Sequence, residues 1–570
     1  MKKLILFICI FLFTSNAYCG WGSKPAIYTT CKTEEKTETN AVEENDDFPK
    51  VTIRGDKLYA GDEELLLKAI GYAGIRPGKD EKDPVPEKDV GYDLVDLDMK
   101  RIKDAGFNTI RMWGLHDEKI IELAAKYKLM VVGGIWTSRI IDIKSKPKLE
   151  QAKEHVAQQA KRYSKYPNVV MLTILNEPEP GTILDVNKTD LLAYFDSLVK
   201  AAHENCPDVP VTFSNWPIAG FIESSSWDVV SYNLYSMASI RFKEVIDFYD
   251  YINGLKQLKS PDKPFFLSEY GMYAPVPKLN PKDIWKFQYV KNEDEQAKKF
   301  IEDLEIISQT NISGYTTMQY MDIWFISRDF SSPEIPLFPP SENKKIHDQV
   351  CIEWGGLVGM DEKYEGIPRK AYYASKKANM GILRKPDTRK LYDKELPIRI
   401  HLEKQVAEVK AIIDGNLIQT IPRVSRSWAE LNIPVKSFST VDKIIKHTLE
   451  VKLFDNRKKI INTLKRTFFT GPKIDLPNIE ITHNLDKMDW PSFIIKLTDV
   501  SGEPVPDVKL DLAFLNAFTW KDAVISTTTD KDGIAVVVSP DYGPLLMGVR
   551  YQYKNGDYKT NSTKLYYYKK

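Results

Sequence analysis

The strongest constraint on the fold is an alternation of short apolar runs with amphipathic stretches across residues 49–383. A short apolar run bounded by polar or turn residues predicts a strand buried on both faces, as parallel sheets require. Eight such runs occur, at 65–70, 109–113, 130–136, 169–175, 209–214, 228–234, 265–268 and 313–320. Stretches with apolar residues at helical spacing lie at 117–128, 149–165, 188–204, 242–259 and 292–309. Eight strands with interleaved helices predict a (β/α)8 barrel of the TIM type.

One link in this alternation is short. The connection between the fifth and sixth runs cannot hold a full helix. A barrel tolerates one shortened connection, but a doubly wound α/β sheet remains an alternative. A last amphipathic stretch at 370–378 is expected to form the helix that closes the barrel.

Past residue 383 the pattern changes to short alternating runs separated by turn residues, which predict all-β domains. We expect a β-sandwich at 384–472 and a second, Ig-like β-sandwich at 473–570. Trp490 and Trp520 are candidates for glycan contact in the last domain. Packing of both sandwiches as braces against the barrel is the reading that we favour.

The first 19 residues have the pattern of a secretory signal peptide. Lys2 and Lys3 precede an apolar run at 4–13, and small residues offer a cleavage site after Ala17. The run is too short to span a bilayer. We therefore expect a protein secreted to the periplasm or the cell exterior.

Residues 20–48 are rich in Thr, Glu, Lys and Asn and lack periodicity, so we expect a disordered tether. A lipid anchor on Cys19 is an alternative, which Tyr18 immediately before it disfavours. The formal net charge of +1 argues against nucleic acid or an anionic membrane as a partner. The cysteines show no metal-ligand spacing, so no metal or other cofactor is expected and their pairing stays open.

Two of the predicted strands lead into a glutamate. The run at 169–175 is followed by Asn176, Glu177 and Pro178, and the run at 265–268 is followed by Glu269. They are the fourth and seventh runs, and parallel barrel strands end at one rim, where enzymes of this fold place their chemistry. Retaining glycosidases need two carboxyls about 5–5.5 Å apart, one protonated and one ionised. Either Glu alone is more typical of a helix cap or a solvated loop, but the pair predicts glycosidase chemistry.

Residues 49–383 resemble clan A glycoside hydrolases, whose acid/base and nucleophile lie on strands four and seven. The segment 176–178 is similar to the acid/base motif of the clan. The segment 268–271, Ser-Glu-Tyr-Gly, resembles the nucleophile motif of family 2 β-glycosidases and of some fungal-type glucanosyltransferases. The resemblance implies that Glu177 is the acid/base, that Glu269 is the nucleophile, and that configuration is retained.

Further segments extend the resemblance. The segment around Arg111 resembles strand two of the clan, which implies that Arg111 contacts Glu269 and favours its ionised form. The segment 228–235 resembles strand six of family 2, which implies that Tyr235 donates a hydrogen bond to Glu269. Asn233 is either a substrate contact or structural, and Asn176 is expected to hold the 2-hydroxyl of the sugar. The segments 355–358 and 368–371 resemble the closing loop and helix of family 2.

Aromatic residues at strand ends are candidates for stacking on sugar faces. Trp113, Trp136 and Trp216 follow strands two, three and five, and capping of the core is the alternative for each. On strand eight the clan commonly carries a Trp, and Met318 stands there in this sequence. Trp324 is the candidate replacement. His116, in the loop after strand two, is expected to be exposed to solvent, and a substrate contact is the alternative.

Two departures from family 2 concern the architecture. Both sandwiches follow the barrel here, whereas that family usually places sandwiches before it. An insertion at 326–352, rich in Pro and charge, has no clear counterpart and is a candidate wall of the cleft. The expected activity is hydrolysis of a β-linked poly- or oligosaccharide. Transglycosylation and non-catalytic carbohydrate binding on a barrel scaffold are alternatives, and sugar, linkage and oligomeric state stay open.

Overall fold

The computed structural model describes most of the chain from residue 48 onward. The described ranges are 48–74, 91–236, 245–275, 288–322, 354–361, 365–422, 427–485, 490–516, 519, 521–541 and 543–569, with the backbone of β5 (Arg76–Pro77) and β6 (Pro84–Val85). The predicted signal peptide, the tether up to residue 47, Trp324, Trp520 and the insertion at 326–352 lie outside the described residues.

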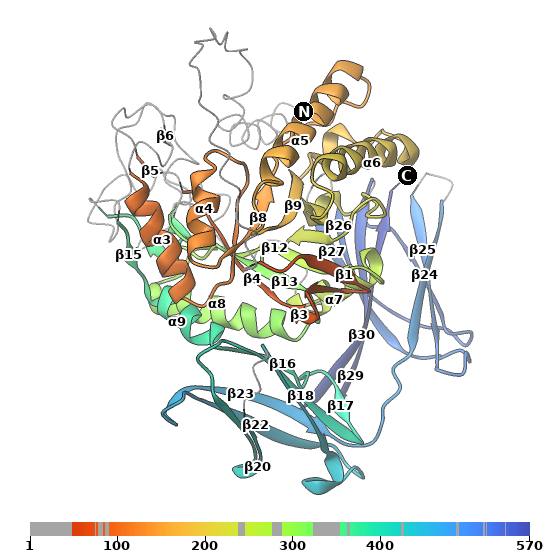
Figure 1. The fold of residues 1–570 in the computed structure, drawn as a ribbon. Helices are drawn as coiled ribbons and strands as arrows, with labels where there is room; N and C mark the ends of the chain where they lie inside the picture. The colour runs from red at the N-terminus through yellow and green to blue at the C-terminus, as the bar shows by residue number, and fades with distance from the viewer. Residues whose placement is uncertain are drawn as a thin grey trace, which may run out of the picture.

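Eight parallel strands close into a barrel (Figure 1). They are β4 (Leu67–Gly71), β7 (Thr109–Arg111), β8 (Met130–Gly134), β9 (Val169–Asn176), β10 (Val211–Asn215), β11 (Val230–Asn233), β12 (Phe265–Gly271) and β13 (Gly314–Met318). The last strand pairs with the first, Gly314 opposite Leu67, so the sheet has no free edge. The (β/α)8 prediction is confirmed, and the doubly wound alternative is wrong.

Helices surround the barrel (Figure 1). They are α3 (Tyr92–Asp104), α4 (Lys119–Lys126), α5 (Lys146–Tyr163), α6 (Lys188–Asn205), α7 (Phe248–Lys259), α8 (Glu293–Ser308) and α9 (Lys370–Asn379). The short fifth connection holds only a single 3-10 turn, Pro217–Ala219. The helix expected from residue 242 begins at Phe248, because the Asp247 side chain caps it by accepting from the Asp250 N–H.

The helix α3 is absent from the sequence prediction. Its buried face carries Val95, Met99 and Ile102 but also Asp98, which breaks the apolar periodicity. Asp98 is buried because its carboxylate accepts a hydrogen bond of 2.9 Å from the Tyr72 hydroxyl. A polar pair of this kind is visible only once both partners are placed.

A small antiparallel sheet closes the bottom of the barrel. It consists of β1 (Val51–Arg54), β2 (Lys57–Ala60) and β3 (Glu63–Leu65). Its Val51 and Leu58 pack with Leu67, Val170 and Phe266, which stand at the amino ends of their barrel strands. The opposite rim, at the carboxyl ends, is therefore the one left for a site.

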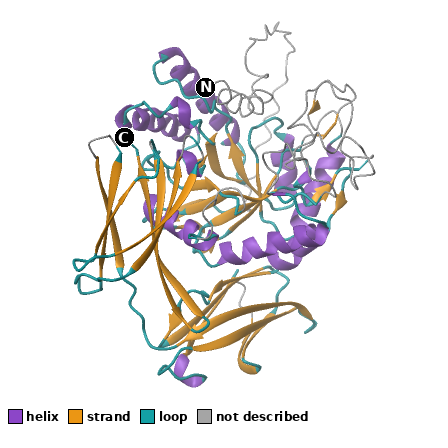
Figure 2. Cartoon of the chain, turned by 180° about the vertical axis from the view of Figure 1, so that it is seen from behind, coloured by secondary structure: helices purple, strands orange, loops and turns teal. Residues whose placement is uncertain are grey.

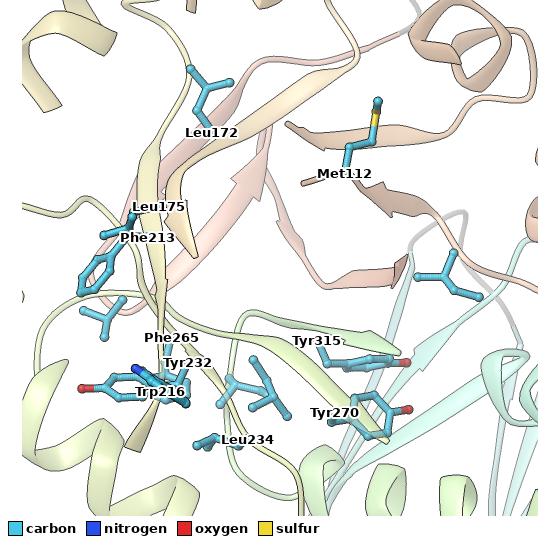
Figure 3. Packing of buried hydrophobic residues seen from close by; sticks show 14 of the residues in the cluster. Met112, Leu172, Leu175, Phe213, Trp216, Tyr232, Leu234, Phe265, Tyr270 and Tyr315 are labelled. Carbon is cyan, nitrogen blue, oxygen red and sulfur yellow. The ribbon is translucent and has the colours of Figure 1, made fainter. Parts of the chain in front are cut away.

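The main core lies between the barrel strands and the helices. Figure 3 shows part of it: Tyr232, Phe265 and Trp216 gather on one side, while Tyr270 and Tyr315 face each other on the other. The Tyr232 and Phe265 rings stack at 5.9 Å, and the Tyr270 and Tyr315 rings meet edge to face at 5.8 Å. Burial of such large side chains from adjacent strands stabilises the barrel on which the site stands.

A buried ion pair links the segment after β13 to the residue that precedes α9. Both guanidinium Nη atoms of Arg369, just before α9, lie 2.7 Å from the Asp322 carboxylate oxygens, and both side chains are fully buried. Arg369 also donates to the Gly356 carbonyl at 2.6 Å, next to β14 (Val358–Gly359), which pairs with β15 (Ile367–Pro368). The polar network thus ties the end of the eighth strand to the last helix.

Two all-β sandwiches follow the barrel (Figure 2). The middle one packs β16 (Gly381–Lys385), β18 (Glu395–Leu402) and β21 (Trp428–Pro434) against β17 (Leu391–Tyr392), β19 (Glu408–Ile413), β20 (Asn416–Pro422), β22 (Ile445–Phe454) and β23 (Ile460–Thr470). The last one packs β24 (Asn478–Leu485), β25 (Pro491–Thr498) and β28 (Ile534–Val538) against β26 (Lys509–Asn516), β27 (Asp522–Thr528), β29 (Leu545–Asn555) and β30 (Tyr558–Tyr568). The predicted fold class, a barrel followed by two sandwiches, is confirmed.

The last sandwich lies against the barrel helices. Leu565 on β30 belongs to the main core, and a Cβ on Gly254 of α7 would lie 2.7 Å from its Cγ atom. Farther along β30, the Tyr567 hydroxyl donates to the Pro217 carbonyl at 2.9 Å. Such close packing favours the bracing role expected for this domain.

Among the described residues, no helix is long and apolar enough to cross a membrane. Cys206 is buried at the end of α6 and unpaired, while Cys19, Cys31 and Cys351 lie outside the described residues.

Candidate active site

The two glutamates stand at the carboxyl ends of their strands. Glu177 directly follows β9, and Glu269 lies near the end of β12 with 5% of its surface exposed. Glu177 has a φ of 49°, a left-handed conformation that side chains other than glycine rarely adopt. Its N–H donates to the Ser214 carbonyl at 2.7 Å, which holds this turn against β10. Such strained positions cluster at functional sites.

Three donors surround the Glu269 carboxylate. Arg111 Nη1 donates to Oε1 at 2.6 Å, and Trp113 Nε1 donates to the same oxygen at 3.2 Å. The Tyr235 hydroxyl donates to Oε2. This buried carboxylate therefore lies beside a full positive charge and accepts two further hydrogen bonds. The contacts that the resemblance implied for Arg111 and Tyr235 are present.

Arg111 also reaches the other side of the site. Its Nη2 donates to Asn176 Oδ1 at 2.8 Å and to Ser214 Oγ at 3.0 Å, and its Nη1 donates to the Ser268 carbonyl at 3.0 Å. With 1% of its surface exposed, the guanidinium is held in one place by groups from β9, β10 and β12. The guanidinium is a fixed cation between Glu269 on one side and Asn176 and Ser214 on the other.

Asn233 completes the link to Glu177. Its Nδ2 donates to Glu177 Oε1 at 2.9 Å and to Asn176 Oδ1 at 3.2 Å, while its Oδ1 accepts from Ser268 Oγ at 2.7 Å. Asn176 Oδ1 therefore accepts from two neighbours, while its Nδ2 donates to no group among the described residues. The two carboxylates are joined through Arg111, Asn176 and Asn233.

The surroundings of Glu177 differ in kind from those of Glu269. Burial raises the pKa of Glu177 above its ordinary value, and the nearby charge of Glu269 adds to this. The Arg139 cation, the Asn233 hydrogen bond and Arg111 oppose the rise without cancelling it. Burial likewise raises the pKa of Tyr235 well above its ordinary value, so this phenol stays a neutral donor.

Three residues of this network were not predicted from the sequence. Ser214 and Ser268 orient Arg111 and Asn233, and Arg139 lies beside Glu177, with its Nη2 3.8 Å from Glu177 Oε2. The two serines lie within buried strands, where any small polar residue fits the pattern. Arg139 stands in a loop with no motif around it, so the sequence held no signal for it.

The candidate aromatic residues lie in different settings. Trp113 is half-buried and packs with Tyr235, Met272 and Met318. A Cβ on Gly71 would lie 2.8 Å from the Trp113 ring, so this glycine at the end of β4 makes room for the indole. Met318 therefore belongs to the apolar group beside Glu269.

The other tryptophans are less directly placed. Trp216 is 6% exposed, belongs to the main core, and donates from Nε1 to the Pro178 carbonyl at 2.8 Å, which favours the core-cap alternative. Trp136 is half-buried in the loop after β8, and His116 is exposed. Within the described ranges, no group of His, Cys, Asp and Glu is arranged to hold a metal ion.

No protein-family model and no curated protein matches the sequence. Among solved structures, a β-glucuronidase from Parabacteroides merdae is 14% identical, with a TM-score of 0.41, covering 91% of this chain and 64% of its own. A β-glucuronidase 3 from Bacteroides uniformis is 15% identical, with a TM-score of 0.43, covering 91% and 65%. A Ruminococcus gnavus β-glucuronidase in complex with D-glucuronic acid is 15% identical, with a TM-score of 0.44, covering 58% and 51%.

The chain thus spans less than two thirds of the length of each of these neighbours.

Proposed function

We propose that the chain is a retaining glycoside hydrolase that cleaves β-glycosidic bonds of a poly- or oligosaccharide by double displacement. The observation that carries the proposal is that two linked carboxyls at one rim have different surroundings. Glu269 receives a cation and two further donors, which suits an ionised nucleophile. Burial raises the pKa of Glu177, which suits a group that must hold a proton at rest.

In the first step, a Glu269 oxygen attacks the anomeric carbon while Glu177 gives its proton to the glycosidic oxygen. The glycosidic bond breaks, the leaving sugar departs as an alcohol, and an ester forms between the glycone and Glu269. Glu177 is now a carboxylate. We expect Asn176 Nδ2 to donate to the 2-hydroxyl, a contact that strengthens in the transition state.

In the second step, the Glu177 carboxylate takes a proton from water, whose oxygen attacks the anomeric carbon. The ester bond breaks and the electron pair returns to Glu269. Arg111, Tyr235 and Trp113 already point at these oxygens, so the returning charge needs no rearrangement. Two displacements at one carbon retain the β configuration.

Under this proposal, a bound sugar ring would lie against an aromatic side chain, Trp113, and an aliphatic one, Met318. Trp113 offers a half-buried indole backed by Met318, in place of the aromatic residue common on strand eight of the clan. Roles for Trp136 and Trp324 in stacking stay predictions.

The test is a screen of the purified chain against β-linked oligo- and polysaccharides, with E177Q and E269Q beside the wild type. E150Q is the matched control, because Glu150 lies on α5 with 65% of its side chain exposed. We expect turnover by wild type and E150Q, and a loss on the order of 10³-fold or more in E269Q. NMR of the first-formed product should show the β anomer. Full activity in E269Q, or an α product, would refute the mechanism.

Two other outcomes separate the alternatives. A product that grows when a sugar acceptor is added, at the expense of the free sugar, would indicate transglycosylation. Glycan binding without turnover by the wild type would indicate a carbohydrate-binding protein.

A further inference from the structure

Arg139 contacts the Glu177 segment at three points. Its Nε donates to the Glu177 carbonyl at 2.7 Å, and its own carbonyl accepts from the Glu179 N–H at 2.9 Å. Its Nη2 lies 3.8 Å from Glu177 Oε2. The first two contacts fix the turn after β9, and the third places a permanent positive charge beside the acid/base carboxyl.

Packing keeps this guanidinium where it is. Its central carbon lies 5.1 Å from the centre of the Trp216 ring, and that indole donates to the Pro178 carbonyl at 2.8 Å. The loop itself is tied to β9, because Thr137 Oγ1 donates to the Ile174 carbonyl at 2.9 Å. With 15% of its side chain exposed, Arg139 is a largely desolvated cation.

The spacing to the carboxyl is informative. At 3.8 Å, Nη2 is beyond hydrogen-bond distance from Glu177 Oε2, and this nitrogen is buried with no hydrogen-bond partner in the described structure. A direct hydrogen bond from a cation would favour permanent ionisation of the carboxyl. A buried carboxyl with no cation nearby would keep its proton and serve poorly as a base.

We propose that Arg139 is a positioning residue that sets the balance between protonated and ionised Glu177, so that this carboxyl serves as acid in one step and base in the next. The inference rests on the proposed glycosidase function. It is consistent with the opposing influences on the pKa of Glu177, where burial is the larger and Arg139 the largest that opposes it.

Other groups face Glu177 as well. They are Arg111 on β7, Asn233 on β11, Tyr235 after β11 and Glu269 on β12. Arg111 is committed to Glu269, Asn233 is neutral, and Tyr235 holds its proton. Arg139 is therefore the cation whose removal changes the charge around Glu177 without breaking the contacts of Glu269.

The experiment is the pH profile of kcat/KM for R139Q, R139M and R139K, on a glycan that the wild type turns over. The alkaline limb reports the loss of the Glu177 proton. Removal of the cation should move the alkaline limb of R139Q and R139M upward by about one pH unit and leave the acid limb in place. R139K keeps the charge, so its alkaline limb should stay near that of the wild type.

R457Q is the control, since Arg457 is exposed on the distant turn between β22 and β23. Melting temperatures check that each variant is folded, and R139M retains an apolar side chain against Trp216 should R139Q unfold. Lower kcat/KM at every pH with an unmoved alkaline limb would assign Arg139 a merely structural role and overturn the proposal.

A second measurement needs no turnover. A 13C NMR titration of the Glu177 carboxyl, assigned by its absence in E177Q, should show a higher midpoint in R139Q than in the wild type. Equal midpoints would overturn the proposal. Absence of glycosidase activity in the wild type would instead refute the proposed function, so the two failures are distinguishable.

Discussion

Arg111 and Glu269 form a buried ion pair across the barrel, with Nη1 2.6 Å from Oε1 and side chains 1% and 7% exposed. Their strands are not neighbours, because β13 and β4 lie between β12 and β7 in the sheet. The pair therefore spans the interior at the carboxyl rim instead of following the strand ladder. The same interaction serves the fold and the charge of the proposed nucleophile.

Loss of the Arg111 charge should destabilise the chain. In R111M the Glu269 carboxylate would stay buried without its cation, and breaking one side of a buried pair costs about 3–5 kcal/mol. R111K should lose less, because an ammonium group keeps the charge. Urea unfolding at neutral pH measures the difference, with R457M as the exposed control. A loss below about 1 kcal/mol in R111M would contradict this account.

The Tyr235 hydroxyl should matter for turnover more than for folding. A hydrogen bond to a charged group contributes about 1.5–3 kcal/mol, so Y235F should lower kcat/KM by about 10–100-fold. Y232F is the matched control, because Tyr232 is a fully buried phenol near the end of β11 with no contact to Glu269 among the described residues. Equal kcat/KM in the two variants would show that the Tyr235 contact with Glu269 does not contribute.

The barrel was predictable because its strands are local patterns. A strand such as Val169–Asn176 is buried along nearly its whole length, so its apolar run is continuous and readable. The sequence did not predict the small sheet β1–β3 at the bottom of the barrel, because its strands are three or four residues long and carry charges on their open face. The helix α3 was missed because its buried Asp98 needs a distant partner, Tyr72.

The residues of the site likewise divide into those that the sequence predicts and those that it does not. Glu177 and Glu269 follow directly from strand ends, and the resemblance to known motifs led to the Arg111 and Tyr235 contacts. Arg139 depends on how one loop folds over another, which no local pattern records. Trp216 ends a strand as a sugar-stacking residue would, and only its burial and its bond to the Pro178 carbonyl favour a supporting role.

The difference in the free energy of unfolding between E177Q and wild type should depend on pH. Because burial raises the pKa of Glu177, the folded chain keeps a proton that the unfolded chain releases above about pH 4.5. The contribution of Glu177 to the free energy of unfolding therefore falls as pH rises through that value, until the folded carboxyl also ionises. E177Q does not titrate, so its stability relative to wild type should be greater at about pH 7 than at about pH 4. Urea unfolding of both proteins at the two pH values measures this, and a constant difference would contradict it.

The last sandwich should influence the acid/base through Tyr567. Its hydroxyl donates a hydrogen bond to the Pro217 carbonyl at 2.9 Å. Pro217 follows Trp216, whose indole donates to the carbonyl of Pro178, the residue after Glu177. Gly220 follows in the same segment, and a Cβ there would lie 2.0 Å from the Tyr567 hydroxyl oxygen.

Y567F should therefore cost about 1 kcal/mol of stability, the usual net contribution of one hydrogen bond. G220A forces the ring or the segment to shift, and a misplacement on the order of 1 Å near reacting groups costs up to about 10²-fold in rate, so we expect kcat/KM to fall at least tenfold. Y373F, at a tyrosine 59% exposed on α9, is the control. If G220A lowers the melting temperature but leaves kcat/KM at the wild-type value, the sandwich braces the barrel without positioning Glu177.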